Sequence, residues 1–258
     1  MKFLASLLIF PVILGMCSFN KEPNKSSEIT TKITITPENK PFAIVQLFTS
    51  QGCSSCPSAD LLLEKVEKEY EGKNVFVLSY HVDYWNRLGW KDVFSKKEFS
   101  DLQYSYSSKF GGSSVYTPQA IVNGDVHFVG SSEAKMDAYL SKYLKIDSEN
   151  VLTLSDVKKL DKQIEFNYKV EGNVTGKSLK IAFAIKKKET KVKRGENSGR
   201  MLSSVNIVVE QIEISLNKTS GSGIIKIPEL VENGDSLTLI GFIQSQNFDI
   251  TAAAQEKI

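Results

Sequence analysis

Cys53 and Cys56 stand between a predicted buried strand and a predicted helix, and this arrangement constrains the fold more than any other part of the chain. Residues 42–48 form a continuous apolar run of branched and aromatic side chains, which predicts a buried strand. A proline opens the helix expected over residues 57–71, where apolar residues recur at helical spacing. A second buried strand is expected at residues 74–80. Together they predict a βαβ unit with parallel strands and a right-handed crossover.

The segment that follows completes an α/β domain. Residues 81–112 are too long for a simple connection and are expected to hold a helical insertion, with helices around residues 95–109. An Asn-Gly turn at residues 123–125, between two short apolar runs, predicts a β-hairpin because it tolerates the positive φ of a tight turn. An amphipathic helix with a serine cap is expected at residues 131–144.

Beyond residue 147 the pattern changes to short strands separated by Gly, Asn and Asp clusters. Roughly seven such segments, with no helical pattern among them, predict an all-β, sandwich-like domain over residues 148–258. The chain has 258 residues and is 41% hydrophobic, which is enough for two domains with their own cores. We therefore expect the α/β domain at residues 41–147, followed by the sandwich.

The first residues carry the pattern of an export signal. A lysine precedes an apolar stretch at residues 3–16, about half the length that a membrane-spanning helix needs. Cys17 resembles the acylated cysteine of a bacterial lipobox, although Met16 stands where a small residue is expected. Lipidation, simple cleavage and a retained anchor therefore stay open. We expect a signal peptide at 1–17, a linker at 18–40, and an exported protein that is periplasmic or a membrane-anchored lipoprotein.

The placement of the cysteine pair favours redox chemistry. At a helix N-terminus a thiol faces unpaired N–H groups and the positive end of the helix dipole, and both stabilise its thiolate. The thiolate is the nucleophile in disulfide exchange. We therefore expect Cys53, at the tip of the loop, to be the more exposed cysteine and to attack. Cys56, one turn inward, is expected to be the resolving thiol.

Three other interpretations of the pair stay open. Exported proteins often keep such a disulfide for stability alone, or the two cysteines are unrelated buried residues. A zinc site needs more ligands, and the candidates Cys17, His81 and His127 have no paired spacing, so no metal or other cofactor is expected. The 32 basic and 30 acidic side chains leave a net charge of +2, which gives no reason to expect nucleic-acid binding.

A proline before the hairpin strengthens the redox interpretation. Thr117 and Pro118 come just before the strand expected at residues 120–122. Thioredoxin-like folds place a cis-proline at this point, facing the dithiol, and a cis bond before proline costs only about 0.5–1 kcal/mol relative to trans. The order of elements resembles that arrangement and predicts a thioredoxin-like domain in which Pro118 shapes the substrate edge. The alternative is an ordinary trans proline at the start of a strand.

Longer motifs extend over nearly the whole mature chain: Phe48–Pro57 with Ala59-Asp60, Tyr80–Trp85, Leu88–Asp92, Val115–Gln119, Val122–Gly124, and Arg194–Arg200 with Asn206. These motifs resemble the bacterial exported thioredoxin-like family catalogued as domain of unknown function 1223 (DUF1223). The resemblance implies a thioredoxin-like domain that carries a CxxC pair. It implies no substrate.

The segment after the second strand supplies further candidate site residues. It lies at the carboxyl end of the strand, where α/β folds gather their ligand-binding groups. His81 and Asp83 are candidates for a base and its orienting carboxylate, or for proton transfer to the inner cysteine. Tyr84, Trp85 and Trp90 are candidates for the wall of a groove for a protein substrate. The alternative is that the aromatic residues form the core of the insertion.

Two polar clusters in the second half have no assigned chemistry. The basic run at residues 186–188 is interpreted as a solvated hairpin tip, since an acidic residue interrupts it and no aromatic platform accompanies it. The Gly-flanked cluster at residues 194–200 is expected to support a contact between the domains or to form a second site. His127 is interpreted as a packed histidine.

The sequence therefore predicts a thiol–disulfide oxidoreductase of the cell envelope, with protein thiols or disulfides as partners. Cys53 attacks, Cys56 resolves, and Thr117 and Pro118 border the substrate. Contact with a membrane is expected only through a lipid on Cys17, and the oligomeric state is not predicted. The alternative is a non-catalytic binding or assembly module in which the disulfide is structural.

Overall fold

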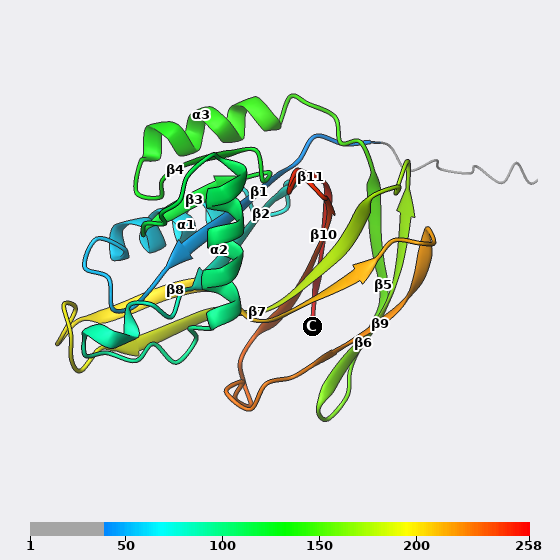
Figure 1. Cartoon of the computed structure of the whole chain (residues 1–258). Helices are drawn as coiled ribbons and strands as arrows, with labels where there is room; N and C mark the ends of the chain where they lie inside the picture. The colour runs from blue at the N-terminus through cyan, green and yellow to red at the C-terminus, as the bar shows by residue number, and fades with distance from the viewer. Residues whose placement is uncertain (1–38) are drawn as a thin grey trace, which may run out of the picture. The chain divides into compact units, whose positions relative to one another are not determined.

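The βαβ unit expected around the cysteines is confirmed in the computed structural model, which describes residues 39–258 (Figure 1). Its elements are strand β1 (Ala43–Thr49), helix α1 (Pro57–Glu69) and strand β2 (Val75–His81). The two strands pair in parallel, from Ala43 opposite Val75 to Thr49 opposite His81. The loop that carries the cysteines therefore leaves the sheet at the carboxyl end of β1.

The helical insertion, the hairpin and the helix after it are also present. They are the 3₁₀ helix η1 (Asn86–Leu88), α2 (Lys97–Lys109), β3 (Gln119–Val122), β4 (Val126–Val129) and α3 (Glu133–Tyr143). Strand β3 pairs antiparallel with both β1 and β4. Asn123 and Gly124 make the turn between β3 and β4 with φ of 51° and 68°, as the Asn-Gly dipeptide predicts.

Helices cover both faces of this part of the sheet. Leu63 of α1 and Leu140 of α3 pack on one face of β1. Phe99 and Tyr106 of α2 pack on the other face, together with Tyr80 of β2. Burial on both faces explains why the sequence of β1 is apolar throughout instead of alternating.

The large sheet continues into the second half of the chain, which differs from the predicted separation at residue 148. Eight strands follow the order β11-β10-β7-β8-β2-β1-β3-β4, and the added strands are β7 (Lys177–Lys191), β8 (Met201–Ser215), β10 (Leu237–Ser245) and β11 (Ile250–Lys257). Strand β8 joins β2 in parallel, with Ser79 opposite Ile207 and the Ser79 hydroxyl donating to the Val205 carbonyl at 2.8 Å. All described residues belong to one compact unit.

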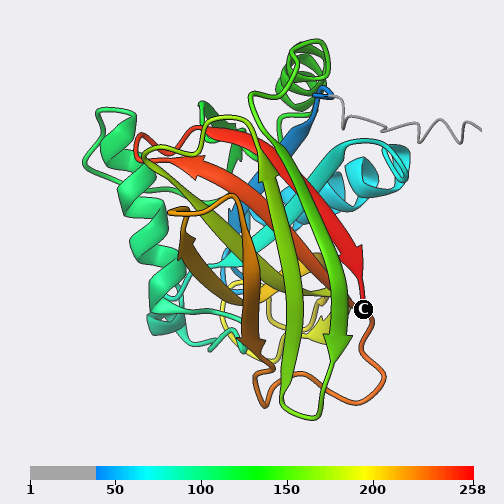
Figure 2. The same ribbon diagram turned by 90° about the vertical axis from the view of Figure 1, so that its right-hand side faces the viewer.

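A small antiparallel sheet packs face to face on the large one, as a sandwich would (Figure 2). Its strands are β5 (Val151–Lys159), β6 (Gln163–Glu171) and β9 (Ser220–Lys226). Leu154, Phe166 and Ile225 from this sheet share a core with Ile181 and Leu239 of the large sheet. The alternating pattern of these strands predicts two packed layers correctly. It carries no information on which sheet each strand joins.

The N-terminal predictions fall mostly on residues outside the described part of the chain. The signal peptide at residues 1–17, with Cys17, lies there, and so does most of the linker at 18–40. Within residues 39–258, no helix is long and apolar enough to cross a membrane.

The basic run at residues 186–188 is not a hairpin tip, because it lies within β7 and each lysine meets an acid. Lys186 pairs with Glu67 of α1, and Lys187 pairs with Glu64 of the same helix at 2.8 Å. Lys188 bonds to Glu232 and Asp235 at 2.7 and 2.8 Å. The first two pairs connect α1 of the first half to β7 of the second half.

Replacing Glu64 by glutamine is expected to lower the free energy of unfolding by about 1–2 kcal/mol at pH 7. Hydrogen bonds from Lys187 and Lys68 lower the pKa of Glu64 from 4.5 to about 2. A lowered folded-state pKa contributes stability above pH 4.5 and loses it as the pH falls towards 2. In urea unfolding, the difference in the free energy of unfolding between the wild type and Glu64→Gln should therefore be smaller at pH 3 than at pH 7. An equal gap at both pH values would contradict this role.

Candidate functional site

Cys53 and Cys56 are joined by a disulfide at the N-terminus of α1, with their Cα atoms 5.4 Å apart. Cys56 is the N-cap of the helix and Pro57 occupies its first turn, as predicted. Both cysteines are fully buried, which corrects the expectation that Cys53 is exposed at the loop tip. The exposed residues of the loop are Ser54 and Ser55. Hydrogen bonds from the Cys53 N–H to the Ser50 carbonyl and from the Cys56 N–H to the Cys53 carbonyl turn the cysteines inward.

The peptide bond between Thr117 and Pro118 is cis, as expected. The Ser55 hydroxyl lies 3.3 Å from the Cys53 sulfur and 3.5 Å from the Thr117 carbonyl oxygen, so the residue before the cis-proline borders the disulfide loop. The Trp85 indole N–H donates to the Thr117 hydroxyl at 2.7 Å. The structure therefore brings the cysteine loop, the cis-proline and Trp85 together.

His81 lies buried at the end of β2, but its partner is not Asp83. The His81 Nδ1 is 2.7 Å from an Asp92 carboxylate oxygen, which also accepts the Gln51 N–H at 2.8 Å. Asp83 instead accepts the Ser100 hydroxyl at 2.5 Å. The chain leaves the sheet after His81, so alternation along a strand no longer decides which carboxylate faces the histidine. Asp92 therefore replaces Asp83 as the carboxylate that orients His81.

A second buried carboxyl group lies one helical turn after Cys56. The Asp60 N–H donates to the Cys56 carbonyl at 3.1 Å, and the Thr49 hydroxyl donates to the Asp60 carboxyl at 3.3 Å. Burial raises the pKa of Asp60 from 3.8 to about 7, although the charge of His81 pulls it the other way. Among the described residues, Asp60 Oδ1 and His81 Nε2 are buried without a hydrogen-bond partner. Spacing predicted neither Asp60 nor Asp92 as a site residue, because only the fold brings them to His81.

The charges of His81, Asp92 and Asp60 shift one another's pKa values. Burial alone would lower the pKa of His81, but the charges of Asp92 and Asp60 and the Asp92 hydrogen bond raise it above 6.5. Burial works against ionised Asp92 as well, yet His81 and two backbone N–H donors, of Gln51 and Phe94, keep its pKa below 3.8. His81 and Asp92 therefore each favour the ionised form of the other, next to the cysteine loop.

The turn between β7 and β8 contacts the cysteine loop directly. The fully buried Asn197 donates its side-chain N–H groups to the carbonyls of Gln51 and Cys53, at 3.0 and 2.8 Å. The Ser54 N–H donates to the Glu196 carboxylate at 3.0 Å. The polar cluster at residues 194–200 thus supports a contact between the two halves of the chain, one of the two roles expected for it. The sequence indicated only that residues 194–200 form a polar cluster. It did not indicate that the cluster contacts the cysteine loop.

The aromatic candidates Tyr84, Trp85 and Trp90 are only partly exposed. The Tyr84 hydroxyl donates to Gln103 at 3.1 Å. The Trp90 indole donates to the Gln51 side chain at 3.1 Å. His127 lies elsewhere, with its Nδ1 3.1 Å from the Tyr116 hydroxyl. Trp90 therefore contacts the cysteine loop through Gln51, whereas Tyr84 bonds to α2. His127 is exposed, with its ring centroid 4.5 Å from that of Phe110, and is not the buried histidine that was expected.

The family model described as "Protein of unknown function (DUF1223)" matches residues 44–244, which span β1, the cysteine loop and most of the large sheet. The chain belongs to this family. No curated protein matches it.

Two solved structures resemble this DUF1223 protein over most of its length. Protein AGR_C_4864 from Agrobacterium tumefaciens is 27% identical, with a TM-score of 0.63, and the match covers 85% of this chain and 95% of that chain. HBP35 of Porphyromonas gingivalis is 16% identical, with a TM-score of 0.59, and the match covers 86% of this chain and 77% of that chain. The likeness to HBP35 concerns the fold alone.

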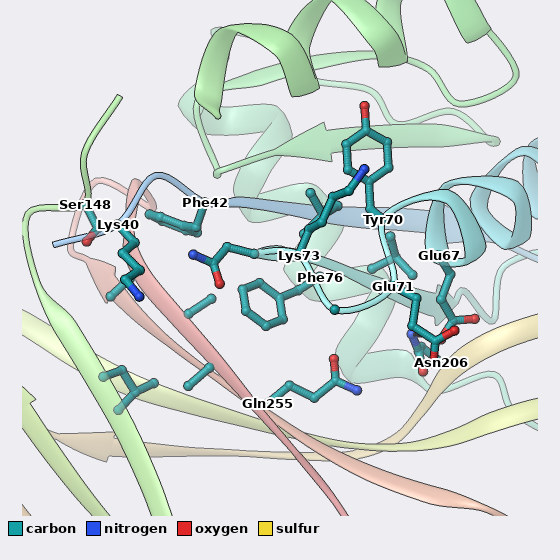
Figure 3. A pocket seen from close by; sticks show the side chains of 18 of the residues that line it. Lys40, Phe42, Glu67, Tyr70, Glu71, Lys73, Phe76, Ser148, Asn206 and Gln255 are labelled. Carbon is teal, nitrogen blue, oxygen red and sulfur yellow. Dashed lines mark hydrogen bonds between the residues drawn. The ribbon is translucent and has the colours of Figure 1, made fainter. Parts of the chain in front are cut away.

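A hollow of about 780 Å³ lies at the other end of β1 and β2 in this DUF1223 protein (Figure 3). The end of α1, the start of β2 and strand β11 line it, with Tyr70, Phe76 and Gln255 among their side chains. Phe42, just before β1, also lines it, whereas the cysteines follow the last residue of β1. The hollow therefore does not serve the disulfide.

Proposed function

We propose that this DUF1223 protein is a thiol–disulfide oxidoreductase of the cell envelope that acts on protein thiols through Cys53 and Cys56. The observation that carries the proposal is the position of the disulfide, at the start of α1 and against the residue before a cis-proline. A helix N-terminus favours a thiolate, which is the reactive form in disulfide exchange.

A thioredoxin-like first half is part of the proposal. Its support is the order of the elements: β1, a CxxC loop, α1, β2, the helical insertion, the cis-proline, the β3–β4 hairpin and α3. In such an arrangement Pro118 borders the disulfide and shapes the surface on which a substrate lies. Thr117 and Trp85, joined by a hydrogen bond, belong to the same surface.

The exchange would proceed in two balanced steps. A substrate thiolate attacks the sulfur of Cys53, the bond between Cys53 and Cys56 breaks, and Cys56 leaves as a thiolate that takes up a proton. A second substrate thiolate then attacks the mixed disulfide at the substrate sulfur and releases Cys53. The substrate leaves with a disulfide, and its two electrons remain on the reduced cysteines. The reverse sequence reduces a substrate disulfide.

Asp60 is the group best placed to handle the proton of Cys56. Its carboxyl is buried one turn along the same helix, and its pKa of about 7 lets it hold or release a proton near neutral pH. His81, held by Asp92, supplies the neighbouring positive charge. The proposal therefore assigns proton handling to Asp60 and charge balance to His81.

The remaining parts of the proposal concern location and partners. The export signal ending near Cys17 supports a protein that is periplasmic or anchored by a lipid, in a compartment where disulfides persist. The partners are proteins that carry thiols or disulfides, and no nucleic acid is among them.

One observation favours the second candidate function, a binding or assembly module with a structural disulfide. Both cysteines are fully buried, so a substrate thiol reaches neither sulfur without a local movement. The reduction potential separates the two functions. A value below about −300 mV is typical of structural disulfides, whereas catalytic pairs lie above it.

Replacing Cys56 by serine tests the proposed function. The variant cannot resolve a mixed disulfide, so it is expected to accumulate covalent complexes with envelope proteins, visible on non-reducing gels and identified by mass spectrometry. The control is the Cys53→Ser, Cys56→Ser double variant, which should trap nothing by this route and also accounts for Cys17. No specific complexes with Cys56→Ser, together with a potential below about −300 mV, would exclude the oxidoreductase and leave the structural role.

A further inference from the structure

The turn between β7 and β8, residues 192–200, is a preformed element seated against the cysteine loop. Its own backbone closes it, with hydrogen bonds of 2.9 Å from the Val192 N–H to the Arg200 carbonyl and from the Gly199 N–H to the Val192 carbonyl. Gly195 adopts a φ of 74°, and a Cβ added there would lie 3.2 Å from the Trp90 Cβ. The turn therefore has a fixed conformation and packs against the chain near Trp90 in a fixed position.

Asn197 locks this turn onto the loop. Its Nδ2 donates one N–H to the Gln51 carbonyl and the other to the Cys53 carbonyl. Its Oδ1 accepts a hydrogen bond from the Arg200 guanidinium at 2.8 Å. A fully buried amide with every polar atom paired holds its neighbours in one position. The residue before it, Glu196, is thereby carried to the Ser54 N–H.

We propose that Glu196 is a positioning residue of the redox pair: its carboxylate holds the Ser54 N–H and thereby makes the disulfide of Cys53 and Cys56 harder to reduce. The role rests on the proposed function. Reduction breaks the bond between the two sulfurs, uses the two electrons of a reductant dithiol and leaves a thiolate on Cys53. The Glu196 carboxylate is bound to the N–H of Ser54, the residue after Cys53, and its negative charge repels that thiolate. It also occupies an N–H group near the start of α1 that would otherwise stabilise an anion.

Other charged residues lie near the cysteine loop or in the turn, and they differ in whether they are buried. From α1 and β2 come Asp60 and His81, and Asp92 follows η1. The turn also carries Lys193, Arg194 and Arg200, which are exposed, and the Arg200 guanidinium donates to the Asn197 Oδ1. Asp60, His81 and Asp92 are buried, whereas Glu196 is exposed. Its charge can therefore be removed without opening the core, and its effect is sensitive to salt.

The test compares Glu196→Gln with Glu189→Gln, which removes an equal charge from an exposed position on β7. In the reduced full chain, the rate of iodoacetamide alkylation against pH gives the thiol pKa of Cys53, resolved by peptide mass spectrometry so that Cys17 is scored separately. Glu196→Gln is expected to lower this pKa by about 0.5–1 unit relative to the wild type. Equilibration with dithiothreitol at pH 8 should show the equilibrium constant for reduction rising about three- to tenfold.

Asn197→Ala releases the turn from the cysteine loop. Like Glu196→Gln, it is expected to lower the thiol pKa of Cys53 and to raise the equilibrium constant for reduction. The shift in Glu196→Gln should shrink between about 10 mM and 500 mM salt, which a purely structural effect would not do. The proposal is overturned when Glu196→Gln and Glu189→Gln give the same pKa and the same equilibrium constant. Failure of Cys56→Ser to trap partners, together with a potential below about −300 mV, would refute the proposed function but not this proposal, because the alkylation curve still reports whether Glu196 acts on the thiol.

Discussion

Replacing Asp60 by asparagine is expected to stabilise the folded protein, and the gain should grow by about 2–3 kcal/mol between pH 5 and pH 8. Burial raises the pKa of Asp60 from 3.8 to about 7, against the charge of His81. Between these values the folded state keeps a proton that the unfolded chain has lost, so the wild type loses stability as the pH rises. Asparagine has no proton to lose and keeps an oxygen for the Thr49 hydroxyl.

Urea unfolding of the oxidised protein at pH 5 and pH 8 measures the effect of Asp60→Asn. The matched control is Asp137→Asn, which alters an exposed aspartate of α3 and should change stability by less than about 0.5 kcal/mol at either pH. A gain of equal size at both pH values would show that Asp60 is ionised throughout the range. Such a result would remove the basis for assigning proton transfer to this residue.

Local features of the site could be predicted because they depend on neighbours in the sequence. The helix that begins at Pro57 and the Asn-Gly turn at Asn123 follow from backbone preferences within a few residues. The cis-proline at Pro118 is predicted instead by the resemblance of the order of elements to thioredoxin-like folds, and the structure has it. The position of the disulfide between β1 and α1 follows from the same kind of pattern.

The long-range contacts could not be predicted, because alternation and apolar runs do not specify a partner. Strand β8 reads as one more strand of a sandwich, yet Ile207 lies beside Ser79 and extends the sheet of the first half. Asn197 contacts Cys53 across 144 positions of sequence, and no pattern around either residue indicates the other. The same limit explains why the sequence predicts Asp83 as the partner of His81, whereas the structure has Asp92.

Replacing Asp92 by asparagine is expected to cost about 3–5 kcal/mol in the free energy of unfolding at pH 6, because it leaves His81 buried without its counter-ion. The two Asp92 oxygens accept from His81, Gln51 and Phe94. Asparagine keeps one acceptor oxygen, so at least one of these donors loses its partner. The loop before Cys53 loses part of its support at the same time.

The pH dependence separates the lost ion pair from lost packing. Because Asp92 and Asp60 raise the pKa of His81, its contribution is complete below pH 6.5 and declines as the pH rises through the folded-state value. The cost of Asp92→Asn should therefore fall between pH 6 and pH 10, so this variant, like Asp60→Asn, gains stability relative to the wild type as the pH rises. Asp101→Asn, which removes an exposed acid paired with Lys97, is the control and should cost less than about 0.5 kcal/mol. A cost for Asp92→Asn that stays constant over this range would mean that His81 is neutral in the folded protein, and that hydrogen bonding alone holds the group beside the disulfide.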